Sequence, residues 1–141
     1  MKNKKSIVDT YYCDIYNFYL VVANKSTTVD QLKKKYIYND GAELDVDNYL
    51  LEGLATTSMC KDKKTNATVC LVKYNRDSDV KTVDKKTDFI NTISHEATHV
   101  AIDIYYYLLD QKLNADSSEP FCYLQGWAAE CIYKTLKKWR I

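Results

Sequence analysis

The distribution of apolar and polar positions divides the chain into a strand-rich first part and a helical second part. Aromatic and β-branched residues dominate three runs of the first part, 11–23, 54–61 and 67–74, and this composition favours strands. Apolar residues fall on both alternating faces of 11–23, which predicts one strand buried on both sides. The runs 54–61 and 67–74 flank a polar turn at 62–66, so we expect them to pair as an antiparallel hairpin.

Shorter signals lie between these runs. Thr28 and Gln31 are spaced as in a capping box, which predicts a short helix that ends near Tyr36. Residues 39–41 are Asn-Asp-Gly, and this sequence predicts a turn after that helix. The stretch 44–51 fits either a strand or a helix.

The second part has helical periodicity. An apolar stripe from Phe89 to Ile104 predicts a largely buried helix that begins at Asp84 or Thr87 and runs to about Leu109. A polar break at 114–118 separates it from a second helix, expected from Glu119 or Pro120 to Lys138. The order of these elements predicts an α+β fold in one domain, 1–141. Its sheet-rich half, 1–80, would hold a small, mainly antiparallel sheet with one helix, and the helical half is 81–141.

Composition narrows the class of protein. Apolar residues make up 46% of the chain and charged residues 28%, with a net charge of +1, so no nucleic-acid partner is indicated. No apolar run approaches the ~18 residues of a membrane span, and Asp9 and Asp14 interrupt the N-terminal apolar stretch. We therefore expect a cytoplasmic protein with no membrane partner. The five cysteines are expected to be reduced, although Cys60 and Cys70 could face each other across the hairpin.

One pentapeptide, residues 95–99, contains side chains that can bind a metal ion and transfer a proton. The only two histidines of the chain, His95 and His99, are four residues apart, so on a helix their imidazoles share one face and can reach one cation. Glu96 lies beside them, where it can take a proton from a water that the cation activates. This H-E-x-x-H spacing is typical of zinc hydrolases. The competing interpretation is a helix that carries two solvated histidines.

A catalytic zinc ion usually has three protein ligands, and no histidine remains to be the third. Glu119 is the best candidate, because it starts the next helix twenty residues after His99. It could instead be a glutamate that only favours the helix dipole. Glu130 is the second candidate, although it is spaced to pair with Lys134 on one helix face, and Cys122 is a weaker one. Asp103 follows His99 by one turn and could orient that imidazole through its second nitrogen, or simply be solvated.

His95-Glu96-Ala97-Thr98-His99 followed at twenty residues by Glu119 resembles the gluzincin branch of zinc metallopeptidases, the thermolysin-like pattern. The run SEPFCYLQGW at 118–127 is also similar to small zincin-like proteins encoded by bacteriophages, which would place the protein in the bacterial host cytoplasm. The motif-bearing resemblance covers roughly the last third of the chain, 88–139.

This resemblance implies a zincin-like fold, with a twisted sheet above the active-site helix. It also implies zinc bound by His95, His99 and Glu119, with Glu96 as the general base in the hydrolysis of a peptide or protein substrate. The substrate would lie extended along a sheet edge, for which 67–74 is the expected strand.

The chain departs from the thermolysin-like pattern in two ways. It lacks the additional histidine that stabilises the oxyanion, so Tyr123 or Arg76 would have to replace it, although Tyr123 is more simply a core or boundary aromatic. Tyr123 also stands where that family has an acidic residue, four positions after its glutamate ligand. The alternative function is therefore a non-catalytic protein that binds a peptide or protein on a zincin scaffold.

Overall fold

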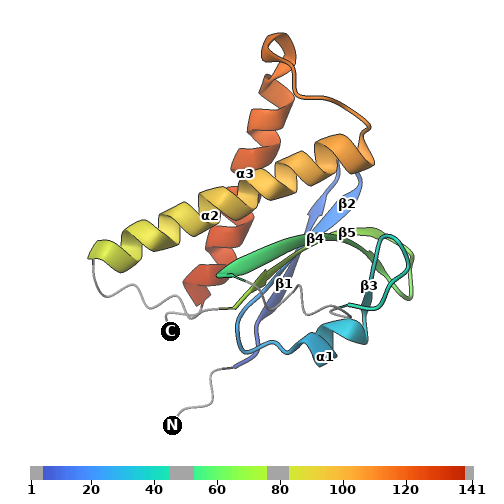
Figure 1. The fold of residues 1–141 in the computed structure, drawn as a ribbon, viewed down its shortest axis with the longest axis vertical. Coiled ribbons are helices and arrows are strands. Elements are labelled where there is room, and N and C mark those ends of the chain that lie inside the picture. The colour runs from blue at the N-terminus through green and yellow to red at the C-terminus, as the bar shows by residue number, and fades with distance from the viewer. Residues whose placement is uncertain (1–4, 45–52, 76–82, 139–141) are drawn as a thin grey trace.

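The computed structural model describes residues 5–44, 53–75 and 83–138. These form an α+β fold in which a five-stranded sheet, in the order β1-β2-β5-β4-β3, is packed against helices (Figure 1). The α+β class is therefore as predicted. The strands are β1 (Val8–Cys13), β2 (Phe18–Ala23), β3 (Tyr36–Tyr38), β4 (Ala55–Asp62) and β5 (Thr68–Tyr74). The helices are α1 (Val29–Lys33), α2 (Val83–Asp103) and α3 (Glu119–Lys137).

The sheet is mixed rather than simply antiparallel. The pairs β1–β2, β3–β4 and β4–β5 are antiparallel, as expected for a small meandering sheet. The pair β2–β5 is parallel, with Leu20 opposite Cys70 and Val22 opposite Val72. The predicted mainly antiparallel character thus holds for three of the four pairs, while the central pair joins two hairpins in parallel.

The run 11–23 is a hairpin and not the single strand that its composition predicted. β1 and β2 pair with Cys13 opposite Phe18, and the four residues between them form the turn. Asn17 closes that turn at a φ of 52°, a left-handed conformation that asparagine tolerates well. The prediction of one strand gave weight to the apolar residues of this run and not to Asp14 and Asn17, two polar residues that are suited to a turn. Of these two strands, only β2 is buried on both faces.

The capping box is present at α1. The Thr28 hydroxyl accepts a hydrogen bond from the Gln31 main-chain N–H at 3.2 Å, and the Gln31 side chain accepts one from the Thr28 N–H at 2.8 Å. The helix ends at Lys33, earlier than predicted, and Tyr36 begins β3 instead of ending the helix. Aromatic and β-branched residues in β3 favour that strand. The predicted turn at 39–41 follows it, with Gly41 at a φ of 92°.

The predicted hairpin of β4 and β5 is confirmed, with Thr57 opposite Val72 and Met59 opposite Cys70. Neighbouring positions in a strand face opposite sides of the sheet, and Cys60 and Cys70 belong to different core clusters. They therefore do not face each other, and all five cysteines are free. The stretch 44–51 lies almost entirely outside the described residues.

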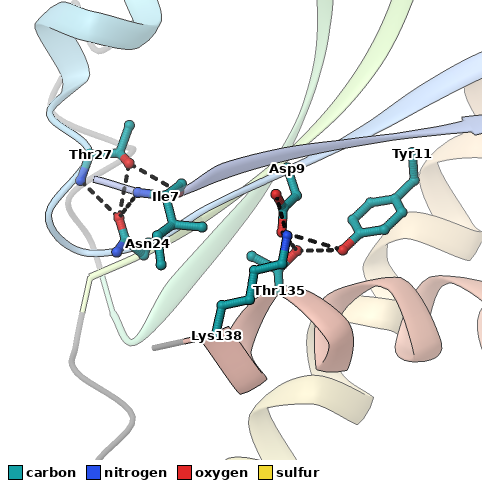
Figure 2. Close-up of polar contacts among 7 residues, drawn as sticks. All are labelled: Ile7, Asp9, Tyr11, Asn24, Thr27, Thr135 and Lys138. Atoms are coloured by element: carbon teal, nitrogen blue, oxygen red, sulfur yellow. Dashed lines mark hydrogen bonds and ion pairs between the residues drawn. The ribbon is translucent and has the colours of Figure 1, made fainter. Parts of the chain in front are cut away.

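The two faces of the sheet are covered differently. Figure 1 shows α2 and α3 crossing each other on one side, with α1 near the opposite end of the strands. The main core lies under α2 and α3 and includes Phe18, Val72, Ile93 and Ile132. Figure 2 shows how α3 is fastened to β1, where Asp9 accepts hydrogen bonds from Lys138 at 2.8 Å and from the Thr135 hydroxyl at 2.9 Å. Tyr11 bonds to the same threonine.

The face away from α2 contains a buried polar group. Lys73 is 2% exposed, and its ammonium group donates to the carbonyl oxygens of Asn24 at 3.1 Å and Tyr74 at 2.7 Å. Burial lowers the pKa of Lys73 to about 8. The hydroxyls of Thr56 and Ser58 on β4 are also buried, and neither has a hydrogen-bond partner among the described residues.

The helical half has the predicted order. Asp84 and Thr87, the expected helix starts, lie inside α2, which begins by Val83. After Asp103 the helix widens into a π-helical turn, Ile104–Leu108, in which the Leu109 N–H bonds to the Ile104 carbonyl at 3.0 Å. α3 begins at Glu119 as predicted.

Candidate metal centre

The two histidines lie together on the exposed surface of α2. His95 and His99 are both exposed, and their Nε2 atoms are 3.1 Å apart. The rings are tilted at 69° with centroids 4.8 Å apart, so the two nitrogens converge instead of stacking. The helical spacing of the motif thus produces the convergence that its sequence predicts.

The distance between these nitrogens suits a shared metal ion. Two imidazole nitrogens at about 2.0–2.1 Å from zinc, with a tetrahedral angle between them, lie about 3.3–3.4 Å apart. The 3.1 Å between the Nε2 atoms of His95 and His99 is close to this separation. It also suits a hydrogen bond between two neutral rings, in which one nitrogen donates to the other. The pair therefore fits as two ligands of a metal without rearrangement.

Glu96 faces the sheet, in contrast to the histidines that flank it. It is 4% exposed, and its Oε2 accepts a hydrogen bond from the Thr57 hydroxyl of β4 at 2.5 Å. Its second carboxylate oxygen has no hydrogen-bond partner in the part of the chain that the structure describes. One oxygen is thus fixed by a neighbouring strand, while the other is available to accept a proton.

Asp103 is placed near His99, as its position one turn later in the helix predicted. Burial raises the pKa of Asp103 to about 6, the charge of His99 lowers it, and the charge of Glu96 raises it. Asp103 is therefore electrostatically coupled to His99 and to Glu96. No hydrogen bond between Asp103 and an imidazole is present among the described residues.

The candidates for a third ligand lie elsewhere. Glu119 and Tyr123 line a hollow between the start of α3 and the β1–β2 turn, together with Trp127. Glu130 forms the i,i+4 ion pair with Lys134 that its spacing suggested, at 2.9 Å. Cys122 is exposed. Among the described residues, no group of three or more His, Cys, Asp or Glu side chains is arranged to hold a metal ion.

Glu119 as third ligand and Tyr123 as oxyanion partner therefore stay predictions, since the structure does not bring either residue to the histidines. Tyr123 has 76% of its surface exposed, so of the two simpler interpretations the core position is excluded and the boundary position is not. Arg76, the other oxyanion candidate, lies outside the described residues.

A hollow of about 670 Å³ opens beside the motif. Thr57 and Met59 of β4 line it, with Asp103 and Tyr107 from the helical side. Thr57 therefore belongs both to this hollow and to the hydrogen bond that fixes Glu96. Sequence analysis missed Thr57, because only the register of β4 against α2 shows which threonine of the run 56–57 meets the glutamate.

The prediction that 67–74 is the edge strand along which the substrate lies was wrong. β5 is paired with β2 on one side and β4 on the other, so it has no open edge. β3 covers only the far half of β4, where Tyr36–Tyr38 is opposite residues 60–62. The Met59 carbonyl accepts the Asn39 N–H, which shows that odd-numbered residues of β4 direct their main-chain groups outward. Thr57 has the same orientation, and no main-chain partner is present on that side among the described residues.

Within the described residues, no helix is long and apolar enough to cross a lipid bilayer. Searches against protein-family models, curated proteins and solved structures find no match for the chain.

Proposed function

We propose that this chain is a zinc-dependent metallopeptidase with a zincin-like fold, in which His95 and His99 bind the metal and Glu96 is the general base. The observation that carries the proposal is the pair of imidazole nitrogens converging at 3.1 Å next to a buried carboxylate. The resemblance of the motif to gluzincins supports the same assignment. Zinc, when bound, would supply the Lewis acidity that polarises a peptide carbonyl and acidifies water.

The residues of the chain would act around that metal in distinct ways. The Glu96 carboxylate takes the proton of the attacking water and returns it to the leaving amine. The Thr57 hydroxyl holds one oxygen of this carboxylate, so that the free oxygen keeps a fixed direction. Asp103 adds negative charge next to His99, which favours a cation between the imidazoles. Glu119 remains the proposed third ligand.

The substrate in this proposal is a peptide in extended conformation along the outer edge of β4. Thr57 presents its main-chain N–H and carbonyl on that edge, next to the hollow of about 670 Å³. Main-chain hydrogen bonds from the edge would fix the register of the peptide, and the hollow would accept one of its side chains.

The first experiment measures zinc by elemental analysis of protein purified without a histidine tag. We expect about one zinc per chain, lost in His95→Ala and in His99→Ala. Ser94→Ala, an exposed neighbour on the same helix, is the matched control and should keep the metal. A wild-type protein that takes up no zinc at neutral pH would overturn the proposal. Glu119→Ala separately tests the third ligand, and an unchanged affinity would remove this residue from the site.

The second candidate function is a zinc-binding protein that does not cleave peptides. It is favoured by the position of Glu119 and Tyr123 in the hollow beside the β1–β2 turn, away from the motif. Incubation of the zinc-loaded chain with a mixed peptide library, followed by mass spectrometry, separates the two functions. Products that disappear on chelation establish the peptidase, whereas metal binding with no products over a day supports the binding protein.

A further inference from the structure

The hollow at the start of α3 has a lining of which the proposed metal centre uses only Glu119. It has a volume of about 510 Å³ and lies between the β1–β2 turn and the first two turns of α3. Four aromatic side chains line its wall, and two carboxylates are the only charged groups that the described residues contribute to it. The aromatic residues are Tyr12, Tyr16, Tyr123 and Trp127, and the carboxylates are Asp14 and Glu119.

The rim of this hollow exposes apolar surface to an unusual degree. Ile15 is 79% exposed, Tyr123 is 76% exposed and Tyr12 is 51% exposed, and all three line the same hollow. Clusters of exposed apolar residues in a folded domain mark binding surfaces more often than isolated ones do. The floor is fixed, because Leu124 is 3% exposed and Trp127 packs edge-on against Phe18 with ring centroids 5.6 Å apart.

The chemistry of this lining selects a cation. Aromatic faces attract positive charge through their quadrupoles, and a carboxylate nearby adds a direct ionic contact. Asp14 and Glu119 carry two negative charges, and no lysine, arginine or histidine of the described part of the chain lines the hollow. An anion would meet repulsion from both carboxylates, although the N-terminus of α3 by itself would attract it. Phosphate groups of nucleic acids or lipids are therefore disfavoured.

We propose that this hollow binds an arginine side chain of another polypeptide. The planar guanidinium stacks on tyrosine and tryptophan rings and forms paired hydrogen bonds with a carboxylate, which a compact ammonium group does less well. The exposed rim, Ile15 and Tyr123, favours a polypeptide over a free small cation, because residues next to the arginine would cover it. The inference does not require the proposed peptidase activity, since neither the histidines nor Glu96 line this hollow, and only Glu119 is shared with the proposed metal centre.

The test uses the intrinsic fluorescence of Trp127 in the full chain. Trp139 is the only other tryptophan, so the Trp139→Phe background reports on the hollow alone. The probes are the capped tripeptide Leu-Arg-Leu and its neutral counterpart Leu-citrulline-Leu, titrated with a chelator present to exclude metal effects. We expect saturable binding of the arginine peptide with a Kd of about 0.1–1 mM, and at least about tenfold weaker binding of the citrulline peptide.

Variants then locate the interaction. Asp14→Asn and Glu119→Gln should each weaken the arginine peptide severalfold, and the double variant should abolish its preference over citrulline. Glu130→Gln removes the same charge from an exposed position of α3 outside this hollow and should leave binding unchanged. Circular dichroism of each variant checks the fold. Asp14 separates this site from the metal centre, because Asp14→Asn should keep the zinc content of the wild type.

Three outcomes would overturn the proposal. Equal binding of the two peptides would show an apolar groove without charge selection. No saturable change in fluorescence up to about 10 mM peptide would show no site at all. Binding that persists in the Asp14→Asn, Glu119→Gln double variant, but weakens in Glu130→Gln, would place the cation elsewhere on α3.

Discussion

Glu96 and Lys73 are both ionisable side chains buried against the same sheet, but on opposite faces and with different partners. Glu96 is held by the side-chain hydroxyl of Thr57 and lies next to two exposed histidines. Lys73 is held by main-chain carbonyls and lies opposite Thr56, whose hydroxyl has no partner among the described residues. One carboxylate is therefore positioned at the surface motif, whereas the lysine ends in the interior.

The different surroundings of Glu96 and Lys73 indicate how burial relates to function in this chain. A buried charge costs free energy in either place, because water no longer solvates it. At Glu96 the desolvated carboxylate adjoins groups that converge on one point, which is the arrangement expected of a general base. At Lys73 burial shifts the pKa, and the hydrogen-bond partners of its ammonium group among the described residues are main-chain carbonyls, so we interpret this lysine as structural. Four predictions test the distinction, in order of expected effect.

The largest effect is expected for Glu96→Gln. Glutamine keeps the size of the side chain and can still bond to Thr57, but it cannot accept the proton of the attacking water. Turnover of peptides should fall by about 10²–10⁴-fold, while the zinc content stays at the wild-type level. Glu130→Gln is the matched control and should retain full activity. Proteolysis at the wild-type rate in Glu96→Gln would exclude this residue as the base.

Lys73→Met should change the pH dependence of stability. The folded pKa of Lys73 is about 8, below the ordinary value of 10.5, so the unfolded chain binds more protons between these values. The penalty from Lys73 is therefore fully present below pH 8 and decreases as the pH rises towards 10.5. Relative to wild type, Lys73→Met should be stabilised by about 1–3 kcal/mol at pH 7, with a smaller gain at pH 9.5.

The quantity to measure is the difference in unfolding free energy between Lys73→Met and wild type, because other groups lower the stability of both proteins at high pH. Burial raises the pKa of Cys60 and of Cys131 to about 12 each, so both thiols favour unfolding as the pH passes their ordinary value of 9. Urea titrations of wild type, Lys73→Met and the exposed control Lys64→Met at pH 7 to pH 9.5 isolate the lysine. A constant difference across this range would contradict the prediction.

Asp103→Asn tests the charge beside the motif. Removing a carboxylate near a ligating imidazole typically lowers metal affinity by about 10–100-fold. We expect a loss in this range for zinc, measured by competition with a chromophoric chelator. Asp110→Asn, an exposed change just after the π-helical turn, should have no effect. An affinity unchanged in both variants would show that the charge of Asp103 does not act on the metal site.

The neighbouring threonines of β4 should have effects that differ in sign, and that of Thr56 should be the smallest of all. Thr57→Val removes the hydroxyl that bonds to a buried carboxylate and should destabilise the fold by about 1–3 kcal/mol. Thr56→Val replaces a buried hydroxyl that has no partner among the described residues, and should be neutral or stabilising by up to about 1 kcal/mol. Thermal unfolding of the two variants decides this. Equal effects would remove the asymmetry between the two faces.

Local patterns predicted much of this structure. The capping box at Thr28, the β4–β5 hairpin and the start of α3 at Glu119 depend on residues close together in the chain, and all three are confirmed. The prediction of a single strand at 11–23 failed because apolar residues outnumber Asp14 and Asn17, the two polar residues of the four-residue turn. The sequence also could not reveal that β5 is central, since strand order depends on contacts between distant segments.

The candidate site shows the same limit. The spacing of His95 and His99 predicted their convergence, because helical geometry alone brings them together. Thr57 could not be predicted, since it reaches Glu96 from a strand that is thirty-nine residues away in sequence. Glu119 was expected to return to the histidines with α3, but it lies in the hollow beside the β1–β2 turn. The crossing of two helices is set by side-chain packing along both, which the spacing of single residues does not encode.

The parallel pair β2–β5 has a consequence for how the chain reaches this structure. Both antiparallel hairpins close over short loops, whereas the parallel pair joins Tyr19 to Val69 across fifty residues. Closing such a long loop has a higher entropic barrier, so the hairpins are expected to form early and their union late. Thr57 belongs to the second of these hairpins, β4–β5, and Glu96 follows that hairpin in the chain. The contact between them nevertheless spans thirty-nine residues, so it belongs with the late, long-range contacts, and the proposed general base takes its position only as the core closes.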